Sequence, residues 1–211
     1  MRVDRAREAA LDALEACRRN GAWIDGALKQ VLKRDGLSGR DAAFASRIAY
    51  GVMQNRIYLD RCLARCLTQR PEKLEPLLLD ILRIGAYQIL FMDKVPVNAA
   101  VNEAVEMAKA HKLSRAAGLV NAVLRNVDRR RGEPLAFADE LEALSVQTSH
   151  PRALVERMVG LLGAEEAEAF LRADNEPVPT TIQTNTLKTT AKRLRASLED
   201  EGVTVEPHPW L

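Results

Sequence analysis

Apolar residues recur every three or four positions from Val3 to about Leu124. This spacing places them on one face of successive helices, the face that packs against other helices. The first such stripe consists of Val3, Ala6, Ala10, Ala13, Leu14 and Cys17. Glycine and proline interrupt the helical stretches at Asp35-Gly36, Pro71, Pro76 and Asp93-Lys94-Val95-Pro96. The pattern predicts an all-α bundle with short connections.

Polar residues that precede the apolar runs indicate where helices begin. Ser38 can cap a helix whose apolar positions extend from Phe44 to Leu67, far enough for a long or kinked helix. Asn98 and Ser114 can cap the two helices that follow the very apolar stretch at 78–90, which we expect at the centre of the bundle. Within these helices, Asn102, Glu103 and Asn121 could suggest a polar active site. Buried hydrogen bonds from Asn102 and Asn121 that fix the helix register are the preferred interpretation.

The pattern changes after Arg131-Gly132. Residues 133–148 are interpreted as a linker or a short capping helix, and a new domain is predicted from Ser149 to Leu211. It begins with helices at 151–162 and 165–173, followed by a proline-rich connector. Residues 180–184 and 203–205 have strand character and flank a helix that Thr190 can cap. Two short strands and one helix cannot form a stable covered sheet, so we expect this small α+β segment to be incomplete at Leu211, whether through an experimental boundary, proteolysis or a truncated gene product.

Charge gives no global reason to expect nucleic-acid binding, because 31 Lys and Arg against 29 Asp and Glu leave a net charge of only +2. Positive charge is instead local. The candidate RNA-binding residues are Arg2, Arg5 and Arg7 at the start and Arg125, Arg129, Arg130 and Arg131 after the bundle. Lys188, Lys192, Arg193 and Arg195 form a third group. Guanidinium groups suit phosphate oxygens, although a solvated helix start, or a favourable position at a helix C-terminus, would also explain the first two clusters.

The sequence shows no cluster of nucleophile, base and orienting group, so no catalytic residue is assigned. Cys62 and Cys66 stand one helical turn apart, but no third ligand is near in sequence, so we expect no metal site. With Cys17 they make three cysteines, an odd number that favours reduced thiols. The first twenty residues are too charged for a signal peptide and no run is long enough to span a membrane; we therefore expect a cytoplasmic protein.

Several blocks of sequence resemble known families. Four blocks resemble the NusB family: RAREAALDAL at 5–14, FASRIAYGVMQNRIYLD at 44–60, LRIGAYQILFMDKVPVNAAVNEAVEMAK at 82–109 and GLVNAVLR at 118–125. Their order makes the resemblance specific, and it implies a NusB-like RNA-binding helical domain at 1–132. The continuation at 149–188 resembles the RsmB (Sun or Fmu) family of ribosomal RNA methyltransferases, which implies that 149–211 begins the methyltransferase part.

The resemblance implies a function as well as a fold. In that family a NusB-like domain precedes a catalytic domain that binds S-adenosylmethionine and methylates carbon 5 of a cytosine in 16S ribosomal RNA. No glycine-rich turn after a strand and no Pro-Cys motif occur in this sequence, so cofactor and catalytic residues are expected only in a longer parent. The expected partners are ribosomal RNA and that C-terminal catalytic domain, not DNA or a membrane. The alternatives are a NusB-type antitermination or protein-interaction module and, last, a stand-alone enzyme.

Overall fold

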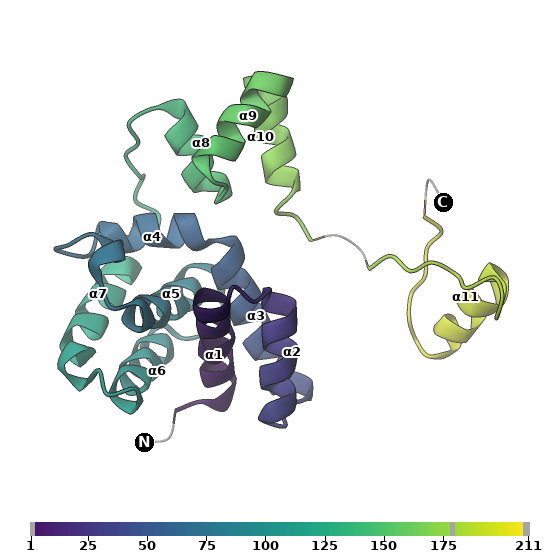
Figure 1. Cartoon of the computed structure of the whole chain (residues 1–211), viewed down its shortest axis with the longest axis horizontal. Coiled ribbons are helices and arrows are strands. Elements are labelled where there is room, and N and C mark those ends of the chain that lie inside the picture. Colours follow the sequence, from purple (N-terminus) through teal and green to yellow (C-terminus); the bar gives the residue numbers. More distant parts are fainter. Residues whose placement is uncertain (1–2, 178–179, 209–211) are drawn as a thin grey trace. The chain divides into compact units, whose positions relative to one another are not determined.

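The computed structural model describes residues 3–177 and 180–208 (Figure 1). Contacts between residues divide the chain into two compact units, the first ending at Asn175 and the second beginning at Glu176. The described residues contain helices and no strand. The all-α bundle that the apolar spacing predicts is therefore confirmed.

Seven α-helices form the body of the first unit. They are α1 (Arg5–Asn20), α2 (Ile24–Arg34), α3 (Gly39–Gln54), α4 (Arg56–Ala64), α5 (Pro76–Phe91), α6 (Val97–Ala110) and α7 (Ala117–Arg129), with short 3-10 helices at Pro71–Lys73 and Ser114–Ala116. Helix α5 contacts α1, α3, α4, α6 and α7. Eleven of its residues, including Ile81, Leu82 and Ile84, are buried. As predicted, the most apolar helix lies at the centre.

The predicted long or kinked helix is two helices. It divides at Asn55, whose side-chain amide donates a hydrogen bond of 2.9 Å to the carbonyl of Gly51. Asn55 is the C-cap of α3 and the N-cap of α4, so the helical stretch is interrupted at this residue and is not one continuous helix. Gly36 ends α2 with a φ of 61°, the left-handed conformation expected there.

Three expectations about polar residues in α6 and α7 are wrong. Pro96, not Asn98, occupies the N-cap of α6, and its carbonyl accepts hydrogen bonds from the backbone N–H groups of Ala99 and Ala100. Proline fixes the chain direction at this point without a side-chain cap. Ser114 begins a 3-10 helix, so it does not cap α7. Asn102 is exposed and therefore fixes no register through a buried hydrogen bond.

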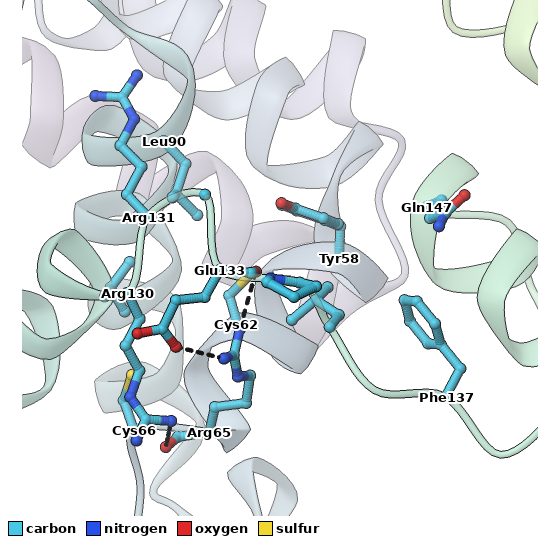
Figure 2. Close-up of a pocket in the computed structure, with 14 residues that line it drawn as sticks. Tyr58, Cys62, Arg65, Cys66, Leu90, Arg130, Arg131, Glu133, Phe137 and Gln147 are labelled. Atoms are coloured by element: carbon cyan, nitrogen blue, oxygen red, sulfur yellow. Dashed lines mark hydrogen bonds and ion pairs between the residues drawn. The ribbon is translucent and has the colours of Figure 1, made fainter.

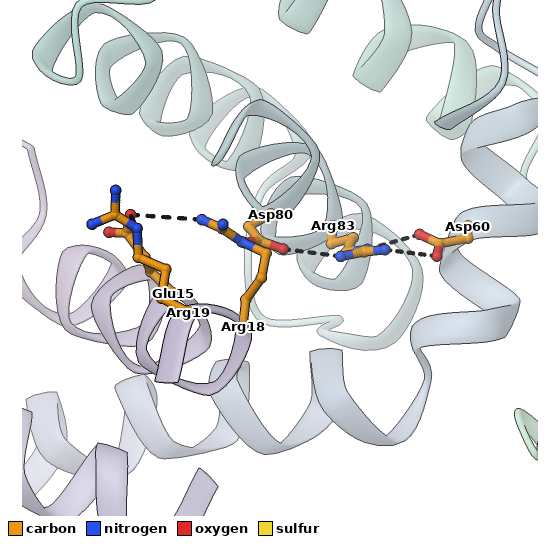
Figure 3. A network of polar contacts seen from close by, with 6 residues as sticks. All are labelled: Glu15, Arg18, Arg19, Asp60, Asp80 and Arg83. Atoms are coloured by element: carbon orange, nitrogen blue, oxygen red, sulfur yellow. Dashed lines mark hydrogen bonds and ion pairs between the residues drawn. The ribbon is translucent and has the colours of Figure 1, made fainter. Parts of the chain in front are cut away.

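An arginine–carboxylate network joins three helices of the bundle (Figure 3). Arg83 of α5 donates to both carboxylate oxygens of Asp60 on α4 at 2.8 Å and to Asp80 at 2.9 Å. Asp80, whose side chain is only 5% exposed, also accepts from Arg18 of α1 at 3.1 Å. Because a buried carboxylate requires such partners, the network fixes α1 and α4 against the central helix.

Three further helices belong to the first unit: α8 (Glu140–Thr148), α9 (Arg152–Leu162) and α10 (Ala164–Ala173). Asp139 caps α8 by accepting a hydrogen bond from the backbone N–H of Glu142, so the segment 133–148 contains the short helix that we considered. Helix α8 contacts α4, and the Ser149 hydroxyl accepts from the backbone N–H of Ile57 at 3.1 Å. The break between the compact units therefore lies beyond the predicted domain boundary at Ser149.

The second unit contains α11 (Ala191–Asp200), which Thr190 caps as predicted by accepting from the backbone N–H of Arg193. The strands predicted at 180–184 and 203–205 are not formed, because the described residues of this unit contain no strand. A strand exists only in a hydrogen-bonded ladder with a partner, and β-branched composition alone does not supply one.

Candidate nucleic-acid interface

The N-terminal arginines do not form one surface. Arg2 lies outside the described residues, so the structure does not place it. Arg5 is exposed at the start of α1, and its guanidinium donates to the backbone carbonyl of Asp35 at the end of α2. Of the two N-terminal arginines that the structure describes, Arg5 is exposed to solvent and Arg7 is buried.

Arg7 lies in the core of the bundle and is only 8% exposed. Its Nε donates to Oε1 of Gln88 on α5 at 2.8 Å, and its guanidinium carbon lies 4.9 Å from the centroid of the Phe44 ring. The sequence contains a signal for this position, because Arg7 precedes Leu11 by four residues and Leu14 by seven, which places all three on one helix face. Arg7 therefore links α1, α3 and α5.

The arginines at the end of α7 are exposed and close together in the chain. Nε of Arg125 donates to Asn121 one turn earlier at 3.1 Å, and its Nη1 donates to Asn98 of α6 at 3.5 Å. Asn98 and Asn121 thus contact an exposed arginine, so the expectation that Asn121 fixes the helix register through a buried hydrogen bond is also wrong. Arg129 occupies the last turn of α7, where a cation also meets the negative end of the helix dipole.

Arg130 and Arg131 follow directly and line a pocket with a volume of about 340 Å³ (Figure 2). Nη1 of Arg130 donates to the carbonyl of Arg65 at 3.2 Å, and Arg131 pairs with Asp93 at 3.3 Å. The pocket lies beside α4, the end of α7 and the segment 132–137. Its lining comprises Tyr58, Cys62, Arg65, Cys66, Leu90, Val127, Arg130, Arg131, Gly132, Glu133, Pro134, Leu135, Phe137 and Gln147.

Two arginines, Arg61 of α4 and Arg65 directly after it, hold the segment 132–137 in place. Arg65 pairs with the carboxylate of Glu133 at 2.7 Å. Arg61 donates to the carbonyl of Ala136, and its guanidinium carbon lies 5.8 Å from the centroid of the Phe137 ring. An aromatic ring and a carboxylate are thereby fixed at the pocket wall.

The thiols of Cys62 and Cys66 lie in the wall of the same pocket. Burial raises the pKa of both thiols above the ordinary value, so they remain protonated near neutral pH. The sequence carries only a partial signal for this pocket, because Tyr58 and Cys62 are four residues apart and share a face of α4, whereas Cys66 lies two residues after the end of that helix. Among the described residues, no group of three or more His, Cys, Asp or Glu is arranged to hold a metal ion.

The third basic group belongs to the second unit. Lys188, Lys192, Arg193 and Arg195 are all exposed in or before α11. Arg195 pairs with Glu199 at 2.7 Å along the same helix, which offsets part of its charge.

None of the helices in the described ranges is long and apolar enough to cross a membrane.

Two family models match consecutive parts of the chain. The NusB family matches residues 4–129, and the ferredoxin-like domain of RsmF/B-like methyltransferases matches residues 150–211. The probable ribosomal RNA small subunit methyltransferase B of Bacillus subtilis is 34% identical over 208 residues, which is 98% of this chain and 46% of that protein. Ribosomal RNA small subunit methyltransferase B of Escherichia coli is 28% identical over 96% of this chain and 46% of its own length.

Solved structures share the fold. The crystal structure of PH0851 superimposes on all of this chain and on 47% of its own, with a TM-score of 0.72 and 21% identity. A chain in the crystal structure of a plectonemic RNA supercoil superimposes on 60% of this one and on 93% of its own, with a TM-score of 0.56 and 19% identity. The chain spans about half the length of the curated relatives that it matches. It belongs to the NusB family over residues 4–129 and, over nearly its whole length, to the family of ribosomal RNA small subunit methyltransferase B.

Proposed function

We propose that this chain is the RNA-binding, substrate-positioning region of an S-adenosylmethionine-dependent 16S ribosomal RNA (cytosine-C5) methyltransferase. The observation that carries the proposal is the order of the two family matches, NusB at 4–129 followed by the RsmF/B ferredoxin-like domain at 150–211. A NusB-type antitermination or protein-interaction module would need only the first match. The second match favours a methyltransferase.

The exposed arginines at the end of α7 supply the physical basis for RNA binding. Arg125, Arg129, Arg130 and Arg131 are all exposed within seven consecutive positions. Phosphate affinity grows with the number of cations that act together, so such a cluster binds more strongly than isolated charges do. Arg5 adds a second exposed cation at the start of α1, whereas the buried Arg7 is assigned to the core.

The described residues do not fit S-adenosylmethionine. A dinucleotide-type site needs a glycine-rich turn between a strand and a helix, and no strand occurs in the described ranges. Gly21 and Gly163, which have positive φ, are the C-cap residues of α1 and α9. Gly36, also with positive φ, lies two residues after the end of α2. We therefore assign the cofactor and methyl transfer to a catalytic domain of the longer parent, and the holding of ribosomal RNA to this region.

The test is RNA binding at several salt concentrations. Fluorescence anisotropy with a labelled single-stranded 16S fragment would compare the chain with Arg125→Gln/Arg129→Gln. If both arginines meet phosphates, the slope of log K against log salt falls by about 1.4, because each single-strand contact contributes about 0.7. The matched control is Arg47→Gln/Arg157→Gln, two exposed arginines outside the candidate clusters. Equal slopes for both double variants, or no RNA binding at low salt, would overturn the proposal.

A further inference from the structure

We propose that the pocket lined by Arg130, Arg131 and Phe137 receives one unpaired RNA nucleotide, its base among the aromatic side chains and its phosphate on the arginines. The inference rests on the proposed RNA binding and adds a nucleotide subsite to it. Most of its lining comes from α4 and the two residues after it, the end of α7 and the segment 132–137, with Leu90 from α5 and Gln147 from α8, all within the first unit.

The size and lining of the pocket suit a nucleobase. A volume of about 340 Å³ lies in the range of small-molecule sites. Leu90 and Val127 contribute apolar surface, and Tyr58 and Phe137 contribute aromatic rings. Unpaired bases of single-stranded RNA stack on such rings, and the hydroxyl of Tyr58 and the amide of Gln147 add polar groups to the wall.

The charge of the lining suits a phosphate. Three arginines, Arg65, Arg130 and Arg131, line the pocket against one carboxylate, that of Glu133. Arg130 uses Nη1 for the carbonyl of Arg65, and a guanidinium has five N–H donors, so most of its donors are not committed to that contact. The partner of Arg131 is Asp93, whose side chain is 90% exposed, so water screens this pair.

Glu133 gives the subsite a competing internal anion. Its carboxylate lies 2.7 Å from Arg65 and its side chain is 50% exposed, so it can leave the guanidinium without a large conformational change. A phosphate bound nearby competes with Glu133 for the same guanidinium. Removal of this carboxylate charge should therefore strengthen nucleotide binding, which loss of a purely structural contact would not do.

The two thiols allow occupancy to be measured directly. Cys62 and Cys66 line the pocket, whereas Cys17 lies on α1 outside its lining. The full chain would be alkylated with iodoacetamide at mildly alkaline pH, with and without a saturating single-stranded 16S fragment, and each site quantified by mass spectrometry. The expected result is at least about fivefold slower alkylation of Cys62 and Cys66 with unchanged Cys17, since a stacked base excludes reagent from the wall.

Three variants test the chemistry by RNA affinity. Phe137→Leu keeps an apolar side chain but removes the ring, and should weaken binding about tenfold. Arg130→Gln/Arg131→Gln should weaken binding and abolish protection of the thiols, whereas Glu133→Gln should tighten it. Arg47→Gln/Arg157→Gln again serves as the control for charge. Unchanged affinity in Phe137→Leu, or alkylation of Cys62 and Cys66 that RNA does not slow, overturns the nucleotide subsite.

The arms of the experiment separate the possible ligands. If RNA binds in a manner that depends on Arg125 and Arg129 but leaves Cys62 and Cys66 unprotected, the subsite is wrong and the proposed function stands. If RNA does not bind at all, both are wrong. Protection by free nucleoside monophosphates at the same concentration as the RNA fragment would refute an RNA subsite in favour of a free nucleotide, and protection by a polyglutamate peptide alone would replace RNA by an acidic protein.

Discussion

Gly51 offers a test of how closely α3 approaches α5. A methyl group added at Gly51 would lie 1.9 Å from Cζ and 2.1 Å from the hydroxyl oxygen of Tyr87. Carbon atoms in optimal contact are about 3.5–4.0 Å apart, so Gly51→Ala requires the ring to move. The ring is buried and stacks on Phe91 at 5.4 Å, and Phe91 meets Tyr58 edge to face at 5.7 Å. Displacement of Tyr87 would therefore disturb three rings.

Two opposing effects set the magnitude. Alanine is favoured over glycine inside a helix by about 1 kcal/mol. Overpacking of a core costs about 1–3 kcal/mol, and so severe an overlap belongs at the upper end. Gly51→Ala should therefore lower the free energy of unfolding by about 2 kcal/mol. Gly26 on α2 is the matched control, because nothing lies within 4 Å of its added methyl group, and Gly26→Ala should stabilise by about 1 kcal/mol.

Urea unfolding followed by circular dichroism would measure both free energies. The decisive feature is the opposite sign of the two changes. In Gly51→Ala/Tyr87→Leu the clashing ring atoms are absent, so the double variant should lose less stability than the sum of the single variants. A Gly51→Ala protein as stable as the parent, or a strictly additive double variant, would refute the close approach of α3 and α5.

Other side chains give further tests of the structure. Arg83→Met should lower the free energy of unfolding by about 3 kcal/mol, because the carboxylates of Asp60 and Asp80 lose their contacts with this guanidinium. Arg152→Met, on the exposed face of α9, should leave the midpoint of urea unfolding unchanged. Similar shifts of the midpoint in both variants would argue against the network. Arg7→Lys should cost about 1–2 kcal/mol but keep the salt slope of RNA binding, and a smaller slope would place Arg7 at the RNA. Because burial raises the pKa of Cys62, its alkylation rate should still rise at a pH where that of a free cysteine peptide has levelled off, and coincident pH profiles would contradict its burial.

The helices were predictable because their signals are local. Apolar spacing located the central helix, and Gly36 and Thr190 mark a helix end and a helix start through their own backbone and side-chain geometry. The start of α6 was not predicted, because two residues, Pro96 and Asn98, compete for one role and the proline takes it. The prediction of strands at 180–184 and 203–205 was wrong for a different reason. Strand formation depends on a partner distant in sequence, and composition does not reveal whether that partner is present.

The candidate site was less predictable than the fold, since it depends on which residues from separate helices meet. Arg130 and Arg131 were visible as a charge run, but the pocket exists only because α4 brings Tyr58 and Cys62 beside the end of α7. Phe137 lies in a segment with no regular structure, so periodicity could not assign it a direction. Cys62 and Cys66 stand one helical turn apart in the sequence, and that spacing alone did not indicate that both line a pocket.

Burial separates two classes of arginine that the sequence makes look alike. Arg7 and Arg83 each meet fixed acceptors on neighbouring helices, so their guanidinium groups have one geometry. Arg129 and Arg130 stand on the last turn of α7 and beyond, exposed, where long side chains can reorient toward phosphates in variable positions. Substitution of Arg7 or Arg83 should therefore lower the free energy of unfolding with little effect on the salt dependence of RNA binding. Substitution of Arg129 or Arg130 should reduce the salt dependence of RNA binding with little effect on the free energy of unfolding. A measurement of stability and of salt dependence on the same variants would distinguish core arginines from the arginines proposed to bind RNA more directly than affinity alone.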